Sequence, residues 1–166
     1  MPAPLRRSRL VAAAVGASIL LGGCGATVER GAGAFQREHG AEARQTAQAV
    51  NGVSSAVAAL GAAPSGAQLE ALLLAQHRAR RRLLAADDWT PLEDGEEEGV
   101  SQAEREIHEG AGSLLRAMTD IRLYAASRRP GELAAYRQAF AGGREYWNQG
   151  ISELWRVAKL SGPPTI

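Results

Sequence analysis

The sequence predicts an all-α protein, an up-down-up-down four-helix bundle that follows a cleaved signal peptide. Apolar residues recur at spacings of three and four over four segments, each roughly 22–30 residues long. Breaks rich in glycine, proline and serine separate most of these segments. No stretch alternates apolar and polar residues, so no strand pattern competes with the helical one.

The first predicted helix runs over residues 34–60, with apolar residues at helical spacing in its second half. Its first half, residues 37–48, has almost no large apolar side chain. A three-helix core with a mobile first helix is therefore the leading alternative. The break GAAPSG ends this segment, because glycine and proline both interrupt helices.

The second and third predicted helices each begin at a capping box, in which Ser and a Gln or Glu three residues later exchange hydrogen bonds. Ser65 and Gln68 predict the start of the second helix, which stops near Asp87. Ser101 and Glu104 predict the start of the third. A start of the third helix nearer residue 91 stays open, because TPLE also fits a capping box with proline at the first helical position.

The fourth predicted helix opens at Pro130, a residue favoured in the first turn. Its apolar seam has spacings of three and four up to Ala158. Gly162-Pro163-Pro164 ends it. The seam consists of Leu133, Tyr136, Phe140, Gly143, Trp147, Ile151, Leu154 and Ala158.

The N-terminus has the three parts of a secretory signal peptide. Arg6, Arg7 and Arg9 are followed by an apolar stretch, residues 10–21, and by small residues. This stretch is short for a spanning helix, which needs roughly 20 apolar residues. An uncleaved signal anchor remains the alternative. The arginines keep the N-terminus inside in either case, so the rest of the chain is expected outside the membrane.

The sequence Leu21-Gly22-Gly23-Cys24 resembles the lipobox of bacterial lipoproteins. The resemblance covers residues 1–24 only. It implies cleavage between Gly23 and Cys24 and a diacylglyceryl group on the Cys24 thiol. Two acyl chains give stable anchoring, so the expected location is the extracytoplasmic face of the cell membrane.

The resulting domain division is a signal peptide over 1–23, a flexible tether over 24–33, the bundle over 34–160 and a tail over 161–166. Cys24 is the sole cysteine, so no internal disulfide is possible. Without the three arginines of the signal, 16 basic and 18 acidic residues remain. That balance argues against nucleic acid as a partner, since such proteins carry a net basic surface.

Two charged stretches have competing interpretations. HRARRRLL, residues 77–84, contains arginines that suit anionic lipid headgroups, because this end of the bundle is expected to face the membrane. The acidic run over 87–98 suits a metal or a cationic partner, although it lacks the pattern of a calcium loop. The favoured interpretation of both is complementation of helix ends.

The histidines do not predict a cofactor or metal site. A di-iron bundle needs Glu three residues before His on two helices, but Gln36, Leu74 and Arg105 stand there. His39, His77 and His108 are therefore expected at the surface or its boundary, and no cofactor is expected.

The predicted fourth helix holds five of the eight aromatic residues and a Gly142-Gly143 pair. Glycines inside helices allow either close packing, the favoured interpretation, or space for a ligand. The candidate pocket, between the third and fourth helices, would be lined by Gly110, Gly112, Phe140, Gly143 and Trp147. An exposed strip for a partner would use Tyr146 and Trp155, which flank the seam.

No catalytic motif is present: the sequence has no G-x-S-x-G, no glycine-rich phosphate loop and no H-E-x-x-H. An enzyme is not expected. The favoured function is a membrane-anchored interaction or accessory lipoprotein of the cell envelope with an unidentified protein partner. The alternative is a lipoprotein that binds a small ligand or a metal between the third and fourth helices.

Overall fold

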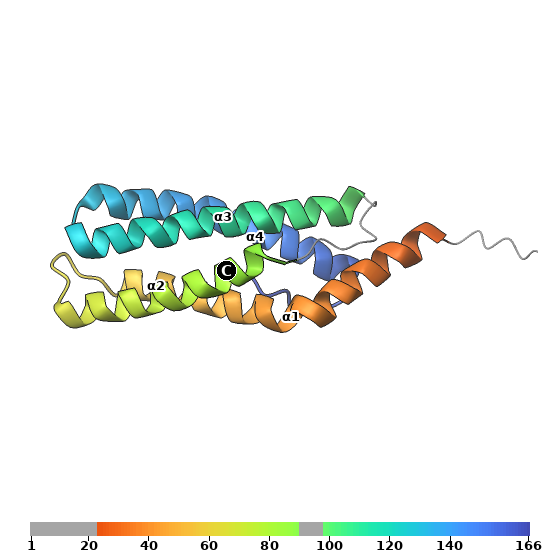
Figure 1. Ribbon diagram of the computed structural model, residues 1–166, viewed down its shortest axis with the longest axis horizontal. Coiled ribbons are helices and arrows are strands. Elements are labelled where there is room, and N and C mark those ends of the chain that lie inside the picture. The colour runs from red at the N-terminus through yellow and green to blue at the C-terminus, as the bar shows by residue number, and fades with distance from the viewer. Residues whose placement is uncertain (1–22, 90–97) are drawn as a thin grey trace, which may run out of the picture.

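The structure, a computed structural model, describes residues 23–89 and 98–166, and within these ranges every regular element is a helix. The four helices are α1 (Gly23–Ala58), α2 (Gly66–Asp87), α3 (Glu98–Ser127) and α4 (Pro130–Val157). They run up and down along one long axis (Figure 1). The predicted all-α fold and its up-down arrangement are confirmed.

The bundle consists of two antiparallel hairpins, α1 with α2 and α3 with α4 (Figure 1). The α3–α4 pair packs most extensively, α2 packs against α3, and α1 packs far less against its neighbour α4 than against its neighbour α2. Val50 and Val53 of α1 are fully buried in the shared core. The alternative of a three-helix core without the first helix is therefore wrong.

Helix α1 begins at Gly23, eleven residues before the predicted start at Ala34. It includes residues 24–33, which the small side chains predicted as a flexible tether. Ala32 and Phe35 explain the difference, because both are buried and their spacing of three places them on one helix face. The contact of α1 with the core therefore continues toward the N-terminus, beyond the stretch 37–48 that has almost no large apolar residue.

Two of the four predicted helix starts are confirmed, those of α2 and α4. The Ser65 N–H donates to Gln68 Oε1 at 2.8 Å and the Gln68 N–H donates to Ser65 Oγ at 3.2 Å, which completes the capping box of α2. Pro130 is the first residue of α4. Ser101, however, lies inside α3, which already begins at Glu98. The possible start near residue 91 lies outside the described residues.

A seam of glycines brings α3 and α4 close together. A Cβ atom added to Gly110 would lie 2.6 Å from the backbone nitrogen of Trp147, and one added to Gly143 would lie 2.9 Å from that of Leu114. Real Cβ atoms do not approach backbone so closely, so only glycine fits there. One added to Gly150 would clash with the carbonyl oxygen of Ala103. The favoured interpretation of the predicted glycines as close-packing residues is confirmed at Gly110 and Gly143 but not at Gly112 or Gly142, and Gly150 is a further contact that was not predicted from the sequence.

An aromatic cluster closes the end of α2 against α1 and α4. Trp89 stacks on His39 with ring centroids 5.0 Å apart and meets Phe35 edge-on at 5.4 Å. Its ring also lies 5.8 Å from that of Trp147. Its indole N–H donates to Glu42 Oε2 at 2.9 Å, so the one polar atom of the ring is satisfied.

The C-terminal tail packs in the seam between α1 and α4. Asn148 Nδ2 donates to the Ile166 carbonyl at 3.0 Å, and the Ile166 N–H donates to Asn148 Oδ1 at 2.8 Å. Trp147 Nε1 donates to the Pro164 carbonyl at 3.2 Å, and Asn51 Nδ2 of α1 donates to the Thr165 backbone carbonyl at 3.3 Å. The tail thus joins two helices that have a small direct interface.

Candidate functional site between α1 and α2

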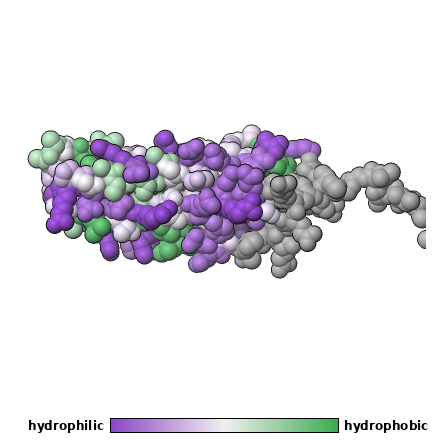
Figure 2. Space-filling model, turned by 90° about the horizontal axis from the view of Figure 1, so that it is seen from above, coloured by the Kyte–Doolittle hydropathy of each residue, from purple (hydrophilic) through white to green (hydrophobic). Residues whose placement is uncertain are grey.

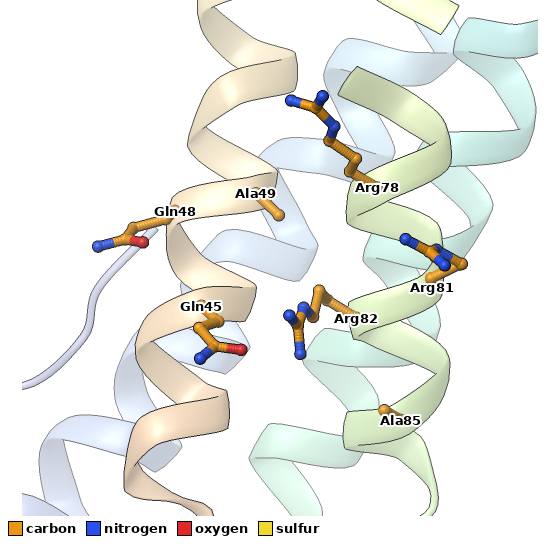
Figure 3. Close-up of a pocket in the computed structure, with 7 residues that line it drawn as sticks. All are labelled: Gln45, Gln48, Ala49, Arg78, Arg81, Arg82 and Ala85. Atoms are coloured by element: carbon orange, nitrogen blue, oxygen red, sulfur yellow. The ribbon is translucent and has the colours of Figure 1, made fainter. Parts of the chain in front are cut away.

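A groove lined by three arginines runs between α1 and α2 (Figure 3). Arg82 reaches from α2 into the space between the helices, and Gln45 faces it from α1. The groove has a volume of about 640 Å³. We call it the arginine groove, and its lining consists of Gln45, Gln48, Ala49, Arg78, Arg81, Arg82 and Ala85.

The periodicity of α2 places the arginines at the edge of its buried face. The buried residues Leu72, Ala79 and Leu83 recur at helical spacing and pack into the core. Arg78 and Arg82 are four residues apart and therefore share one side of the helix. Small residues at positions 49 and 85 leave the space between the helices open to the guanidinium groups.

The groove is strongly cationic. Its lining includes no carboxylate. Within the described part of the chain, Arg78, Arg81 and Arg82 form no ion pair. Guanidinium groups stay protonated at all physiological pH values and present several donors in a planar fork that matches carboxylate or phosphate. A ligand with grouped negative charges therefore suits this groove.

Apolar side chains are exposed on the same helix. Leu73, Leu74 and Leu84 retain 40%, 52% and 39% of their accessible surface. Leu74 lies one helical turn before Arg78, in line with the arginines. By contrast, Figure 2 views the bundle from the side where α3 and α4 lie in Figure 1, and that face is mostly hydrophilic with small scattered hydrophobic areas.

The arginine groove lies away from the start of α1. Gln45 is separated from Cys24 by a length of about 30 Å along the helix, at 1.5 Å per residue. Electrostatic attraction between solvent-exposed charges is screened beyond about 8 Å at physiological salt. If Cys24 is anchored as the lipobox resemblance implies and the bundle stands upright, the lipid surface would not reach these arginines.

The pocket predicted between the third and fourth helices does not match the packing of α3 and α4. Gly110, Gly143 and Trp147 meet in direct backbone contact, and Trp147 is fully buried. Gly112 has no neighbour within 4 Å of an added Cβ, so it does not contribute to that contact. Phe140 is the remaining predicted residue, and it lines a different groove, between α1 and α4.

Of the two residues predicted to form a partner strip, the structure exposes one and buries the other. Tyr146 is 42% exposed, as expected, but Trp155 is only 2% exposed. Trp155 follows Trp147 and Ile151 at spacings of eight and four, so it lies on the buried stripe of α4. The expectation that Trp155 is available to a partner is wrong.

The histidines take three different environments. His77 is exposed, and His108 Nδ1 lies 3.7 Å from Asp87 Oδ1. His39 is only 9% exposed, stacks on Trp89 and has its Nδ1 3.7 Å from Glu42 Oε2, so it is more buried than the surface or boundary position that was expected. Within the described ranges, no group of three or more His, Cys, Asp or Glu residues is arranged to hold a metal ion.

Of the residues predicted at the N-terminus, Gly23 is the first residue of α1 and Cys24 the second. Residues 1–22 lie outside the described part of the chain. In the part that is described, no helix is long and apolar enough to cross a membrane.

Sequence reasoning identified the arginines but missed Gln45, Gln48 and Ala49, which form the opposite wall. Their only sequence signal is the near absence of large apolar side chains over residues 37–48. Comparison of the chain with protein-family models, curated proteins and solved structures finds no match.

Proposed function

We propose that this chain is an extracytoplasmic lipoprotein, anchored to the cell membrane through Cys24, that binds an acidic segment of an envelope protein in the arginine groove. The observation that carries the binding role is the concentration of three arginines around a concave surface whose lining has no carboxylate. The lipobox resemblance supports the anchor.

A protein segment suits the groove better than an isolated ion. The groove lies between two helices (Figure 3). The exposed Leu74 lies one helical turn before Arg78 on α2. An amphipathic helix laid into a groove uses apolar anchors at helical spacing. Carboxylates on such a helix would meet Arg78, Arg81 and Arg82, while its apolar side chains would cover Leu74.

The anchor is tested by intact-mass measurement and membrane fractionation of the full chain beside Cys24→Ala. We expect a cleaved protein that carries a diacylglyceryl-sized mass, and release of the variant from the membrane fraction. An uncleaved chain that stays in the membrane in both forms would identify a transmembrane anchor instead.

The groove is tested with a synthetic acidic helix that carries Glu at i, i+3 and i+4 and Leu on the adjoining positions. The triple variant Arg78→Gln/Arg81→Gln/Arg82→Gln should weaken its binding at least 10-fold, because charge-assisted hydrogen bonds contribute about 1.5–3 kcal/mol each. The matched control is Arg105→Gln/Arg116→Gln/Arg122→Gln on α3, which changes net charge equally and should bind almost as the parent does.

Two results would contradict the groove assignment. Equal losses in both triple variants would mean that net charge alone attracts the peptide. Binding to vesicles of anionic lipid that is lost only in the α2 variant would make the arginines a membrane-binding surface rather than a protein-binding one.

A further inference from the structure

A second groove lies between α1 and α4, on the other side of α1 from the arginine groove. It has a volume of about 400 Å³, within the range of about 300–1,000 Å³ that is usual for small-molecule sites. Val57, Leu60 and Phe140 contribute apolar walls, and Tyr136, Arg137 and Arg144 contribute polar atoms. The docked tail at Asn51 and Asn148 fills the seam further along the same two helices.

Tyr136 is the unusual member of this lining. Its side chain is 3% exposed, yet its buried hydroxyl has no hydrogen-bond partner among the described residues. Buried polar atoms are nearly always paired, so an orphan hydroxyl beside a groove needs an explanation. Burial raises the pKa of Tyr136 to about 12, against a smaller opposing effect of the Arg137 charge. The hydroxyl therefore stays protonated, and it is a donor without an acceptor.

The two arginines give the groove a positive edge. Arg137 and Arg144 are seven residues apart, which places them two turns apart on one side of α4. The lining includes no carboxylate, and within the described ranges neither arginine forms an ion pair. A negative group at this edge would meet two cations, while the apolar walls lie beside it.

We propose that the α1–α4 groove binds a small amphipathic monocarboxylate, with its carboxylate at Arg137 and Arg144 and its apolar body against Val57, Leu60 and Phe140. An oxygen of the ligand accepts the hydrogen bond that the Tyr136 hydroxyl lacks. Entry requires a small separation of α1 from α4, and this is the seam between neighbouring helices where direct packing is smallest. The inference is independent of the proposed partner of the arginine groove.

The probe is dodecanoate, titrated calorimetrically into the full chain below the concentration at which it forms micelles. We expect saturable binding with one site. Arg137→Gln/Arg144→Gln should weaken it at least 10-fold and Tyr136→Phe about 5-fold. Ala141→Leu, which adds a side chain to the groove wall without changing charge, should also weaken it, because it occupies ligand space.

Three comparisons make the outcome decisive. Dodecyltrimethylammonium, with the same chain and the opposite charge, should bind weakly, and equal binding would overturn the assignment of a carboxylate site. Absence of saturable dodecanoate binding, or binding unchanged in Tyr136→Phe and in the double arginine variant, would also overturn it. The α2 triple variant should bind dodecanoate as the parent does, and loss there would move the site to the arginine groove.

The Tyr136→Phe variant is informative because it should fold. The hydroxyl that it removes has no partner to lose, so its thermal unfolding midpoint should equal or exceed that of the parent. A lower midpoint would show that the hydroxyl already has a partner within the protein. The Tyr136 hydroxyl would then not be available to donate to a ligand, which would contradict the proposal.

Discussion

At the scale of the residue, the glycines inside the helices of this bundle fall into two groups: some are packed against a neighbouring helix and others have no neighbour. Gly110, Gly143 and Gly150 touch the backbone of the neighbouring helix, whereas Gly112 and Gly142 face open space. The sequence shows all five as helical glycines. It cannot distinguish them, because the helix crossing that presses three of them together is set by both helices at once.

The substitution of Gly150 by alanine tests the close contact. Its added methyl group would clash with the Ala103 carbonyl and lie 2.8 Å from Ile107 Cγ1, so α3 and α4 must separate. We expect Gly150→Ala to lower the free energy of unfolding by about 1–3 kcal/mol, the usual cost of overpacking. Urea denaturation measures it.

Gly142→Ala is the matched control on the same helix. Nothing lies within 4 Å of its added Cβ, so the gain in helix propensity should dominate and raise the free energy of unfolding by up to about 1 kcal/mol. Similar destabilisation by both substitutions would mean that the seam is not where the structure places it.

Tyr146 and Trp155 show how well apolar periodicity predicts the burial of single residues. Both flank a seam drawn strictly at spacings of three and four. A core-facing helix of a globular bundle buries a wider stripe than that, however, and Trp155 falls within it. The apolar seam of α4 was predictable, but its width depends on how deeply α4 is set against α1 and α3.

At the scale of the element, helix starts were predictable where a side chain caps the first backbone N–H groups, or where proline, which has no N–H to cap, occupies the first turn. The Ser65 capping box begins α2 as predicted, and Pro130 begins α4. Ser101 has the same local pattern but lies in the fourth position of α3. A capping motif shows only that a helix start at Ser101 would be favourable. The packing of the buried Val100 and Ala103 against the core favours a helix that begins before Ser101.

Loss of the α2 cap should be measurable. Ser65→Ala removes the acceptor of the Gln68 N–H and should lower the free energy of unfolding by about 1 kcal/mol, the typical cost of a lost N-cap. Chemical denaturation of the variant measures the change. Ser65→Asp keeps an acceptor and should restore most of it, so an equal loss in both variants would contradict a capping role.

At the scale of the whole molecule, the sequence supported the class of fold and the order of helices, but not the contacts that complete it. The grooves and the docked tail depend on pairs of residues far apart in the chain, such as Asn51 with Thr165. The arginines were visible in the sequence as a run. The wall of small and polar residues that turns that run into a groove was not, because no local pattern links residues 45–49 to residues 78–85.

The docked tail provides a test at this scale. Asn148→Ala removes both hydrogen bonds to Ile166 and should lower the free energy of unfolding by about 1–2 kcal/mol. It should also speed hydrogen exchange at the Ile166 amide, measured by NMR. Gln149→Ala, at the exposed neighbouring position, should leave that amide protected, and equal exchange in both variants would contradict the docking.

Helix α1 forms one wall of both grooves: residues 45–49 face the arginines of α2, and residues 54–58, with Leu60 just after the helix, line the groove beside Tyr136. A ligand that shifts α1 in one groove therefore alters the shape of the other. Thermodynamic linkage requires this effect to be reciprocal, so that each ligand changes the dissociation constant of the other by the same factor. If both proposed sites exist, binding at one would therefore change the affinity of the other through this shared helix.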